Sequence, residues 1–154
     1  MPHIHGKIDN TSEALIVYKD KVLLRKHDKY YIWLSVGGHI ELDEDPNEAV
    51  IREVKEEVGL NIELYRQHYI PIFSEENYKE LIPPIFMNRH RINENHEHVT
   101  GVYFARAFTD KLILSEKEKS KECRWFTSQD LDDNKLEIKE MVKFYAKTAL
   151  EFLN

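Results

Sequence analysis

The feature that most constrains this chain is a helix with two unlike faces, predicted over residues 45–58 and ended by Gly59. Asp45, Pro46 and Glu48 supply an N-terminal cap, a proline at the first helical position and an acid at the third. At about 100° per residue, aliphatic and acidic residues fall on separate faces. The aliphatic face holds Val50, Ile51, Val54 and Val58, and the acidic face holds Glu53, Glu56 and Glu57. One side therefore packs against a core while the other presents three carboxylates.

Predicted strands alternate with this helix and one other along the rest of the chain. Runs of apolar and β-branched residues predict strands at 14–18, 22–25, 30–34, 62–73, 85–92, 98–108 and 123–126. Turn-forming residues occupy 93–96, a charged loop 115–121 and a capped turn 127–131. From Leu136 to Leu153 the apolar residues fall at helical spacing, which predicts an amphipathic helix. We therefore expect one mixed α/β domain over residues 1–154, in which helices cover a mixed β-sheet.

The net charge of −6 is concentrated in residues 41–57, which contain eight acidic and two basic residues. The remaining positions sum to zero, and no compensating basic run stands elsewhere in the chain. Such a block repels phosphates and nucleic-acid backbones unless a cation intervenes. A protein that binds DNA or RNA through a basic face is therefore disfavoured, and no nucleic-acid polymer is expected as a partner.

The cellular location is inferred from three further features. Cys123 is the single cysteine, so no intramolecular disulfide can form and a reducing compartment is expected. No apolar run approaches the roughly 18 residues of a membrane span, and the first residues lack the pattern of a signal peptide. We expect a cytoplasmic protein with no membrane partner.

The acidic face of the helix suggests a site for a divalent cation. Crowded carboxylates repel one another unless a cation lies between them. Magnesium is the expected ion because it takes carboxylate oxygens, keeps several waters and bridges to phosphates, whereas calcium prefers more protein ligands. Taken alone, the helix also fits the simpler interpretation of a solvated acidic surface.

A longer pattern around this helix resembles the signature of the Nudix hydrolases. Gly38-x5-Glu44-x7-Arg52-Glu53-Val54-x-Glu56-Glu57-x-Gly59-Leu60 matches that signature, G-x5-E-x7-R-E-U-x-E-E-x-G-U with U aliphatic, at every specified position. Trp33 and Gly37 before it, and Trp125 and Phe126 near the last predicted strand, also agree. A proline often precedes the glycine pair in the family, where this chain has Val36, which affects loop rigidity more than ligands. The resemblance implies a Nudix fold with the signature as loop, helix and loop.

The resemblance also implies an activity, a metal and roles for the signature residues. Nudix enzymes hydrolyse a nucleoside diphosphate linked to another group, using divalent metal and water at phosphorus. Glu56 and Glu57 would be metal ligands, Glu53 a ligand or the base for the attacking water, and the carbonyl of Gly37 a further ligand. Arg52 would orient the carboxylates through ion pairs. The implied ion is Mg²⁺, with Mn²⁺ as the alternative.

Several candidates lie outside these central positions. Glu44 would tie the loop to the helix, and Gly38 allows close backbone approach to metal or phosphate, or forms a plain tight turn. His39 either touches a phosphate or only lines the loop. Many Nudix enzymes take a further carboxylate from a later loop, for which Glu97 is the candidate here and Glu94 its rival. Tyr78 stands where dinucleoside polyphosphate hydrolases often place a tyrosine.

Two His-x-His pairs, His3 with His5 and His96 with His98, raise the question of a zinc site. Such a pair without further ligands is weak, and we interpret these as surface histidines. Cys123 stands in an apparent strand with no pattern of a nucleophile around it, so we interpret it as a packed thiol.

The sequence specifies the substrate less well than the chemistry. Markers downstream of the signature that accompany ADP-ribose or NADH hydrolysis are absent. We expect a metal-dependent pyrophosphohydrolase acting on a small nucleotide or nucleotide conjugate, and we favour a nucleoside triphosphate that releases pyrophosphate. The alternative is a non-catalytic Nudix module that binds a nucleotide metabolite as a sensor. Isomerase chemistry would need a cysteine in the site. Nudix proteins are often homodimers, and no feature of this sequence decides the oligomeric state.

Overall fold

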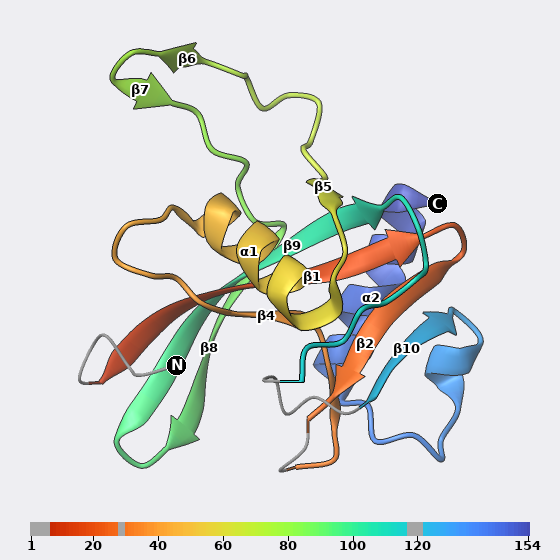
Figure 1. Cartoon of the computed structure of the whole chain (residues 1–154). Coiled ribbons are helices and arrows are strands. Elements are labelled where there is room, and N and C mark those ends of the chain that lie inside the picture. The colour runs from red at the N-terminus through yellow and green to blue at the C-terminus, as the bar shows by residue number, and fades with distance from the viewer. Residues whose placement is uncertain (1–6, 28–29, 117–121) are drawn as a thin grey trace.

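A mixed β-sheet lies between two helices, α1 (Pro46–Val58) on one face and α2 (Glu140–Leu153) on the other (Figure 1). The computed structural model describes residues 7–27, 30–116 and 122–154. Among these residues, neither helix is long and apolar enough to cross a membrane. The arrangement is the mixed fold predicted from the sequence, with the acidic helix packed on the sheet through its aliphatic face.

Two long parallel strands, β1 (Ile8–Tyr18) and β9 (His96–Ala107), form the centre of the sheet. The strand order through them is β10-β2-β1-β9-β5, with β3, β4 and β8 paired to β2, β1 and β9 respectively. The other named pairings are antiparallel. The bounds of the remaining sheet strands are β2 Lys21–Lys26, β3 Trp33–Leu34, β4 Val36–His39, β5 Ile62–Leu64, β8 Phe86–Asn93 and β10 Glu122–Thr127.

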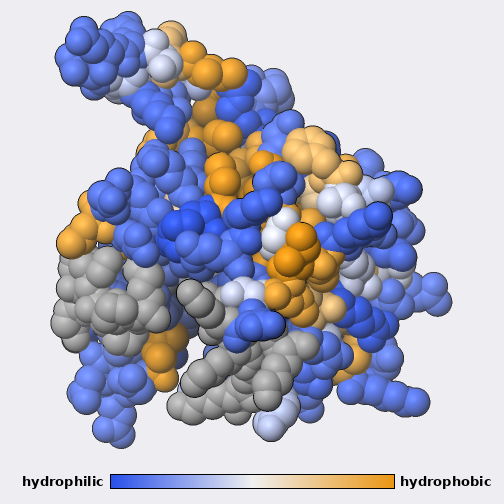
Figure 2. All heavy atoms as spheres, in the orientation of Figure 1, coloured by the Kyte–Doolittle hydropathy of each residue, from blue (hydrophilic) through white to orange (hydrophobic). Residues whose placement is uncertain are grey.

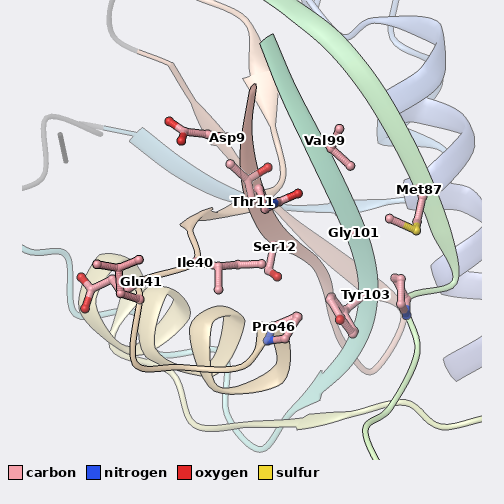
Figure 3. A pocket seen from close by; sticks show the side chains of 13 residues that line it. Asp9, Thr11, Ser12, Ile40, Glu41, Pro46, Met87, Val99, Gly101 and Tyr103 are labelled. Atoms are coloured by element: carbon pink, nitrogen blue, oxygen red, sulfur yellow. The ribbon is translucent and has the colours of Figure 1, made fainter. Parts of the chain in front are cut away.

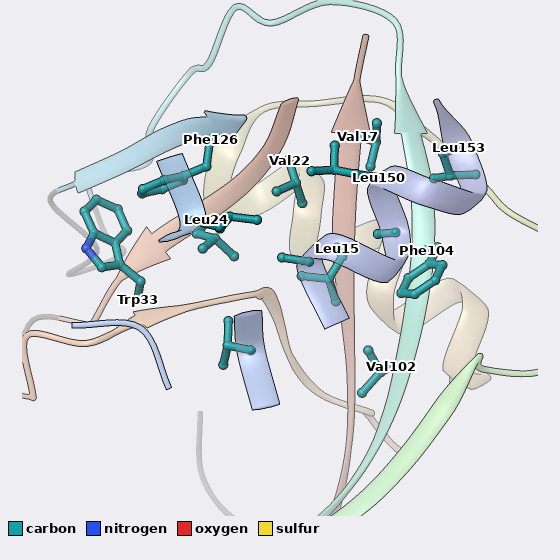
Figure 4. Packing of buried hydrophobic residues seen from close by; sticks show 14 residues of the cluster. Leu15, Val17, Val22, Leu24, Trp33, Val102, Phe104, Phe126, Leu150 and Leu153 are labelled. Atoms are coloured by element: carbon teal, nitrogen blue, oxygen red, sulfur yellow. The ribbon is translucent and has the colours of Figure 1, made fainter. Parts of the chain in front are cut away.

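Side chains of the central strands alternate between two apolar cores, one beneath each helix. On the α2 side, Leu15 and Phe104 pack in one buried cluster with Leu150 (Figure 4). On the α1 side, Ile16 and Val54 belong to the second cluster. On the aliphatic face predicted for α1, Val50, Val54 and Val58 are buried as expected, whereas Ile51 is exposed.

The ends of α1 are fixed by the local sequence, as predicted. Asp45 Oδ1 accepts a hydrogen bond from the Glu48 backbone at 2.8 Å, and the Glu48 carboxylate accepts one from the Asp45 backbone at 3.4 Å. This reciprocal capping box satisfies two of the donors left free at a helix start. Gly59 ends the helix with φ of 73°, a left-handed conformation that residues with a Cβ rarely adopt.

The strand predicted over 62–73 is wrong beyond its first residues, because the sheet edge it needs is already taken. Strand β5 pairs with the end of β9, and Tyr65 N still donates to Phe104 O at 2.7 Å. The next stretch of that edge is paired with β8, beginning with Ile85 N to Val102 O at 2.8 Å. The chain therefore leaves the sheet and forms a projecting two-stranded hairpin, β6 (Ser74–Glu75) with β7 (Tyr78–Lys79) (Figure 1).

The last helix begins later than predicted, at Glu140 rather than near Leu136. A turn occupies residues 134–136, and the chain then runs beside β3, where Ile138 forms an isolated parallel bridge with Trp33 and Trp33 N donates to Glu137 O at 3.0 Å. A short 3-10 helix, η1 (Asp130–Asp132), stands where a capped turn was expected. The buried residues of α2 are Val142, Ala146, Ala149, Leu150 and Leu153, whereas the apolar residues Met141 and Phe152 are exposed. Part of the predicted charged loop at 115–121 lies outside the described residues.

Candidate active site

The two glycines before α1 lie in strand β4 rather than in a tight turn. A Cβ on Gly37 would lie 2.2 Å from the backbone oxygen of Ser12, so only glycine lets β4 approach β1 this closely. A Cβ on Gly38 would lie 2.5 Å from the carboxyl carbon of Glu53. Because Gly38 has no side chain, the Glu53 carboxylate of α1 fits directly against strand β4 at this point.

Arg52 holds the acidic residues together through all five of its N–H donors. Its Nε and Nη2 atoms donate to the two carboxylate oxygens of Glu44, at 3.0 and 2.7 Å, and so form a bidentate pair. Nη2 also donates to the backbone oxygen of His39 at 3.0 Å. Nη1 donates to Glu53 at 3.0 Å and to Glu56 at 3.1 Å. One guanidinium thus connects strand β4, the following loop and the acidic face of α1.

The bond between Arg52 and Glu44 dominates the electrostatics of this loop. Hydrogen bonding from the guanidinium lowers the pKa of Glu44, and the same bond raises the pKa of Arg52. The Glu44 carboxylate also accepts a hydrogen bond from the backbone of Glu41 at 2.9 Å. Both groups therefore remain charged at neutral pH, and Glu44 ties the loop to the helix.

The three glutamates of the acidic face differ in exposure. The side chain of Glu57 is 4% exposed and lies 3.3 Å from Arg25 Nε, which also donates to the Ser35 carbonyl at 3.2 Å. Glu53 is similarly buried against Gly38, whereas the Glu56 side chain is 52% exposed. Hydrophilic side chains gather over the exposed side of α1 (Figure 2). Arg25, a cation from strand β2, was not anticipated from the sequence.

The donor chemistry of this face fits a magnesium ion, although the carboxylates are not preassembled into one cluster. Arg52 bridges Glu53 and Glu56, while Glu57 faces Arg25. Within the described part of the chain, these three do not form a group whose ligand atoms all lie within 4.8 Å of one another. Magnesium needs only one or two carboxylates besides water and substrate oxygens, so the face supplies enough ligands.

A cavity of about 450 Å³ opens beside the signature loop (Figure 3). Its lining includes Tyr103 and Ser12, and the strand partner of Ser12 is Gly38, so the cavity begins next to the glycine that lies against Glu53. Ile40 and Leu42 from the loop and Met87 from β8 give it apolar walls. The volume lies within the range of about 300–1,000 Å³ found for small-molecule sites.

None of the predicted site residues is among those that line this cavity, and three of them are held away from it by other contacts. His39 directs its ring toward Asp9 and His98, with Nε2 3.3 Å from the Asp9 carboxylate. Tyr78 is 56% exposed on the projecting hairpin, where its hydroxyl donates to Glu80 at 2.7 Å. The Glu97 carboxylate pairs with Arg89. None of the three is brought to the cavity, because each side chain is held by neighbours on its own part of the sheet or hairpin.

The structure brings together a histidine cluster that the sequence interpretation missed. Among the described residues, one group of candidate ligand atoms lies within 4.8 Å, formed by Asp9, His39, His96 and His98. Burial and the nearby imidazoles lower the pKa of His98 to about 4, so it is neutral at pH 7. The only sequence signal was the His-x-His spacing, which puts both rings on one face of a strand. The other predicted pair, His3 and His5, lies outside the described residues.

Comparison with known proteins agrees with this geometry. The family model for the NUDIX domain matches residues 9–148. A hydrolase of the NUDIX family from Clostridium perfringens is 37% identical, with a TM-score of 0.84 over 95% of this chain and 98% of that one. The RNA pyrophosphohydrolase of Roseobacter denitrificans is 27% identical over 82% of this chain and 79% of that protein. The m7GpppN-mRNA hydrolase NUDT17 of Xenopus laevis is 28% identical over 82% of this chain, which spans only 44% of that relative. The chain therefore belongs to the Nudix family of hydrolases.

Proposed function

We propose that this protein is a magnesium-dependent pyrophosphohydrolase that cleaves a phosphoric anhydride bond of a nucleotide. The observation that carries the proposal is the placement of Glu53 and Glu56 on Arg52, with Glu53 against Gly38 and Glu57 beside Arg25, near a cavity of nucleoside size. The names of two relatives, an RNA pyrophosphohydrolase and an mRNA hydrolase, support the same bond type.

The side chains divide the work according to their exposure. Glu56, the most exposed of the three, is the first carboxylate available to a magnesium ion, and Glu53 and Glu57 lie behind it. When bound, magnesium neutralises phosphate charge and lowers the pKa of a coordinated water. Glu53 serves as a further ligand or as the base, and the Gly37 carbonyl is an additional ligand candidate. Arg52 keeps the glutamates in position and is itself not available as a base, because it stays protonated.

A small nucleotide is the substrate class that we favour, and a nucleoside triphosphate within it. The cavity is mostly apolar, with polar atoms from Asn10, Ser12 and Tyr103, which suits a base and ribose. The block of negative charge at residues 41–57 disfavours a long polyanion beside the site. RNA is the competing substrate, because one relative is named an RNA pyrophosphohydrolase and another an mRNA hydrolase, and a 5′-triphosphorylated RNA contains the same type of bond.

The test is a hydrolysis screen with and without Mg²⁺ over nucleoside triphosphates, ADP-ribose, sugar nucleotides, dinucleoside polyphosphates and a 5′-triphosphorylated oligoribonucleotide. We expect Mg²⁺-dependent release of pyrophosphate or a mononucleotide from one class. Glu56→Gln should lose at least about 100-fold in rate, the scale associated with a catalytic group. The matched control is Glu63→Gln, an exposed glutamate on β5 that should keep full activity.

Two results would contradict the proposal. Equal rates for the wild type and Glu56→Gln would show that the acidic face does not perform the reaction. Absence of hydrolysis from every substrate, together with a nucleotide that raises the melting temperature, would instead favour the alternative of a binding module.

A further inference from the structure

We propose a second metal site, distinct from the carboxylates of α1, that binds Zn²⁺ through four side chains: Asp9, His39, His96 and His98. The inference does not depend on which nucleotide the protein hydrolyses. It rests on the ligand types, on their spacing and on the strands that hold them.

The spacing of these side chains approaches that of a zinc site. Four ligands at about 2.0–2.1 Å from a tetrahedral zinc lie about 3.4 Å apart. The Nε2 atoms of His39 and His96 lie 3.3 and 3.2 Å from the same Asp9 oxygen, Oδ2. All four ligand atoms lie within 4.8 Å of one another. Small side-chain rotations that move these atoms by about 1 Å would bring the remaining separations to the tetrahedral value.

Three neighbouring strands position the ligands on one side of the sheet. Asp9 on β1 is the strand partner of His98 on β9, and His39 on β4 is the strand partner of Thr11, two residues after Asp9 on β1. His96 and His98 are two residues apart on the same strand, so their rings share a face. Strands hold side chains more precisely than loops, and such a site is largely formed before the metal arrives.

The ring contacts and burial agree with a common centre. The ring of His98 lies 5.0 Å from that of His39 and 5.1 Å from that of His96, measured between centroids. Asp9 is 1% exposed and His96 6% exposed, so both are shielded from bulk water.

This site is chemically and spatially distinct from the glutamates. Val36 packs on the α1 side of the sheet, and alternation along β4 turns Gly38 toward Glu53 and His39 toward the opposite side. Three imidazoles and one carboxylate suit zinc in four-coordinate geometry, whereas magnesium prefers oxygen ligands alone. The sheet therefore separates two sites of different metal preference.

The backbone of His39 connects the two sites. Its carbonyl accepts a hydrogen bond from Arg52 at 3.0 Å, and its side chain would bind the zinc. A metal here would fasten the end of β4 to β1 and β9, and so fix the strand against which Arg52 and Glu53 are placed. The role that we assign to zinc is structural positioning of the end of β4, and Asp9, which also lines the cavity, places the zinc site next to it.

The experiment uses the full chain, stripped of metal and then titrated with Co²⁺ and Zn²⁺ in excess Mg²⁺, which fills oxygen-only sites. We expect one Co²⁺ per chain with the strong visible absorption of four-coordinate cobalt, displaced by one equivalent of Zn²⁺. Zinc should also raise the melting temperature. His98→Gln should weaken binding by at least about 100-fold, since even changes to outer-shell partners cost about 10–100-fold.

Control variants make the assignment specific. His68→Gln, which removes an exposed histidine outside the cluster, and Glu56→Gln should both bind as the wild type does. His96→Gln is the second test variant, and the melting temperature of each metal-free variant establishes that it is folded. The weak spectrum of six-coordinate cobalt, unchanged binding in both cluster variants, or loss of binding in Glu56→Gln would each overturn the proposal.

Discussion

Replacing Arg52 by alanine is the most informative single perturbation of this protein. The substitution removes five hydrogen bonds at once and leaves Glu44 and Glu53 without the guanidinium that pairs them. Their side chains are only 10% and 9% exposed, so water cannot replace the lost partner fully. Stability and activity should therefore both fall.

The structure allows the loss of stability to be estimated. Removing one partner of a buried ion pair costs about 3–5 kcal/mol. The Arg52 side chain is 23% exposed and Glu56 stays hydrated, so we expect the lower end, about 3 kcal/mol. In a domain of this size each 1 kcal/mol shifts the melting temperature by about 2–4 °C, which gives a fall of about 6–12 °C.

The loss should also depend on pH in a defined direction. The pKa of Glu44 is lowered in the folded state by its bond to Arg52. Its contribution to stability is therefore present above the unfolded pKa of about 4.3 and disappears as the pH falls through the lower folded value. The difference in stability between wild type and Arg52→Ala should be greatest near neutral pH and shrink below about pH 4.

Urea unfolding followed by circular dichroism, at a series of pH values from neutral to acidic, measures these quantities. The matched control is Lys55→Ala, an exposed cation on the same helix, whose effect should stay within about 1 kcal/mol. A loss below about 1 kcal/mol for Arg52→Ala at neutral pH would refute the reasoning. A large loss that does not change with pH would refute the role assigned to Glu44.

Three further predictions concern the same face. Glu57→Gln should lower the free energy of unfolding by about 1–3 kcal/mol, because it removes the charged partner that Arg25 has in Glu57. Glu56 is exposed, so Glu56→Gln should change that free energy by no more than about 0.5 kcal/mol, and equal melting temperatures for the two variants would contradict this prediction. Gly38→Ala should reduce hydrolysis more than it reduces stability, because the new methyl displaces the Glu53 carboxylate, and full activity in steady-state assays would argue against that contact. Mg²⁺ should raise the melting temperature of the wild type but raise that of Glu56→Gln less, and an identical rise in both would place the ion elsewhere.

The parts of the site that the sequence predicts are those formed by residues close together along the chain. The capping residues of α1 and the two faces of that helix follow from local spacing, and the bond from Arg52 to Glu44 agrees with the roles that the family resemblance implied for them. Helical periodicity and a loop of fixed length are enough to place such groups.

The parts that could not be predicted depend on which strands become neighbours. Asp9 meets His98 only because β1 and β9 pair in parallel, and nothing local to either residue encodes that register. Arg25 reaches Glu57 from a strand that precedes the signature. Likewise, the end of β5 is set by the position of β8 on the same edge of β9. The roles of Glu97 and Tyr78 stay predictions, although neither lines the cavity.

The way in which β5 and β8 share one edge of β9 has a consequence for engineering. The segment between them leaves the sheet at Tyr65 and returns at Ile85, hydrogen-bonded to β9 residues two positions apart. Its length can change without shifting the register of the sheet, and lengthening a loop costs little free energy. Pro84 at its return lines the cavity, and Lys79 on its hairpin lies 3.4 Å from Asp45 at the start of α1. The segment is thus a cassette that can be grafted from another family member to alter the rim of the cavity while the carboxylates of α1 stay in place.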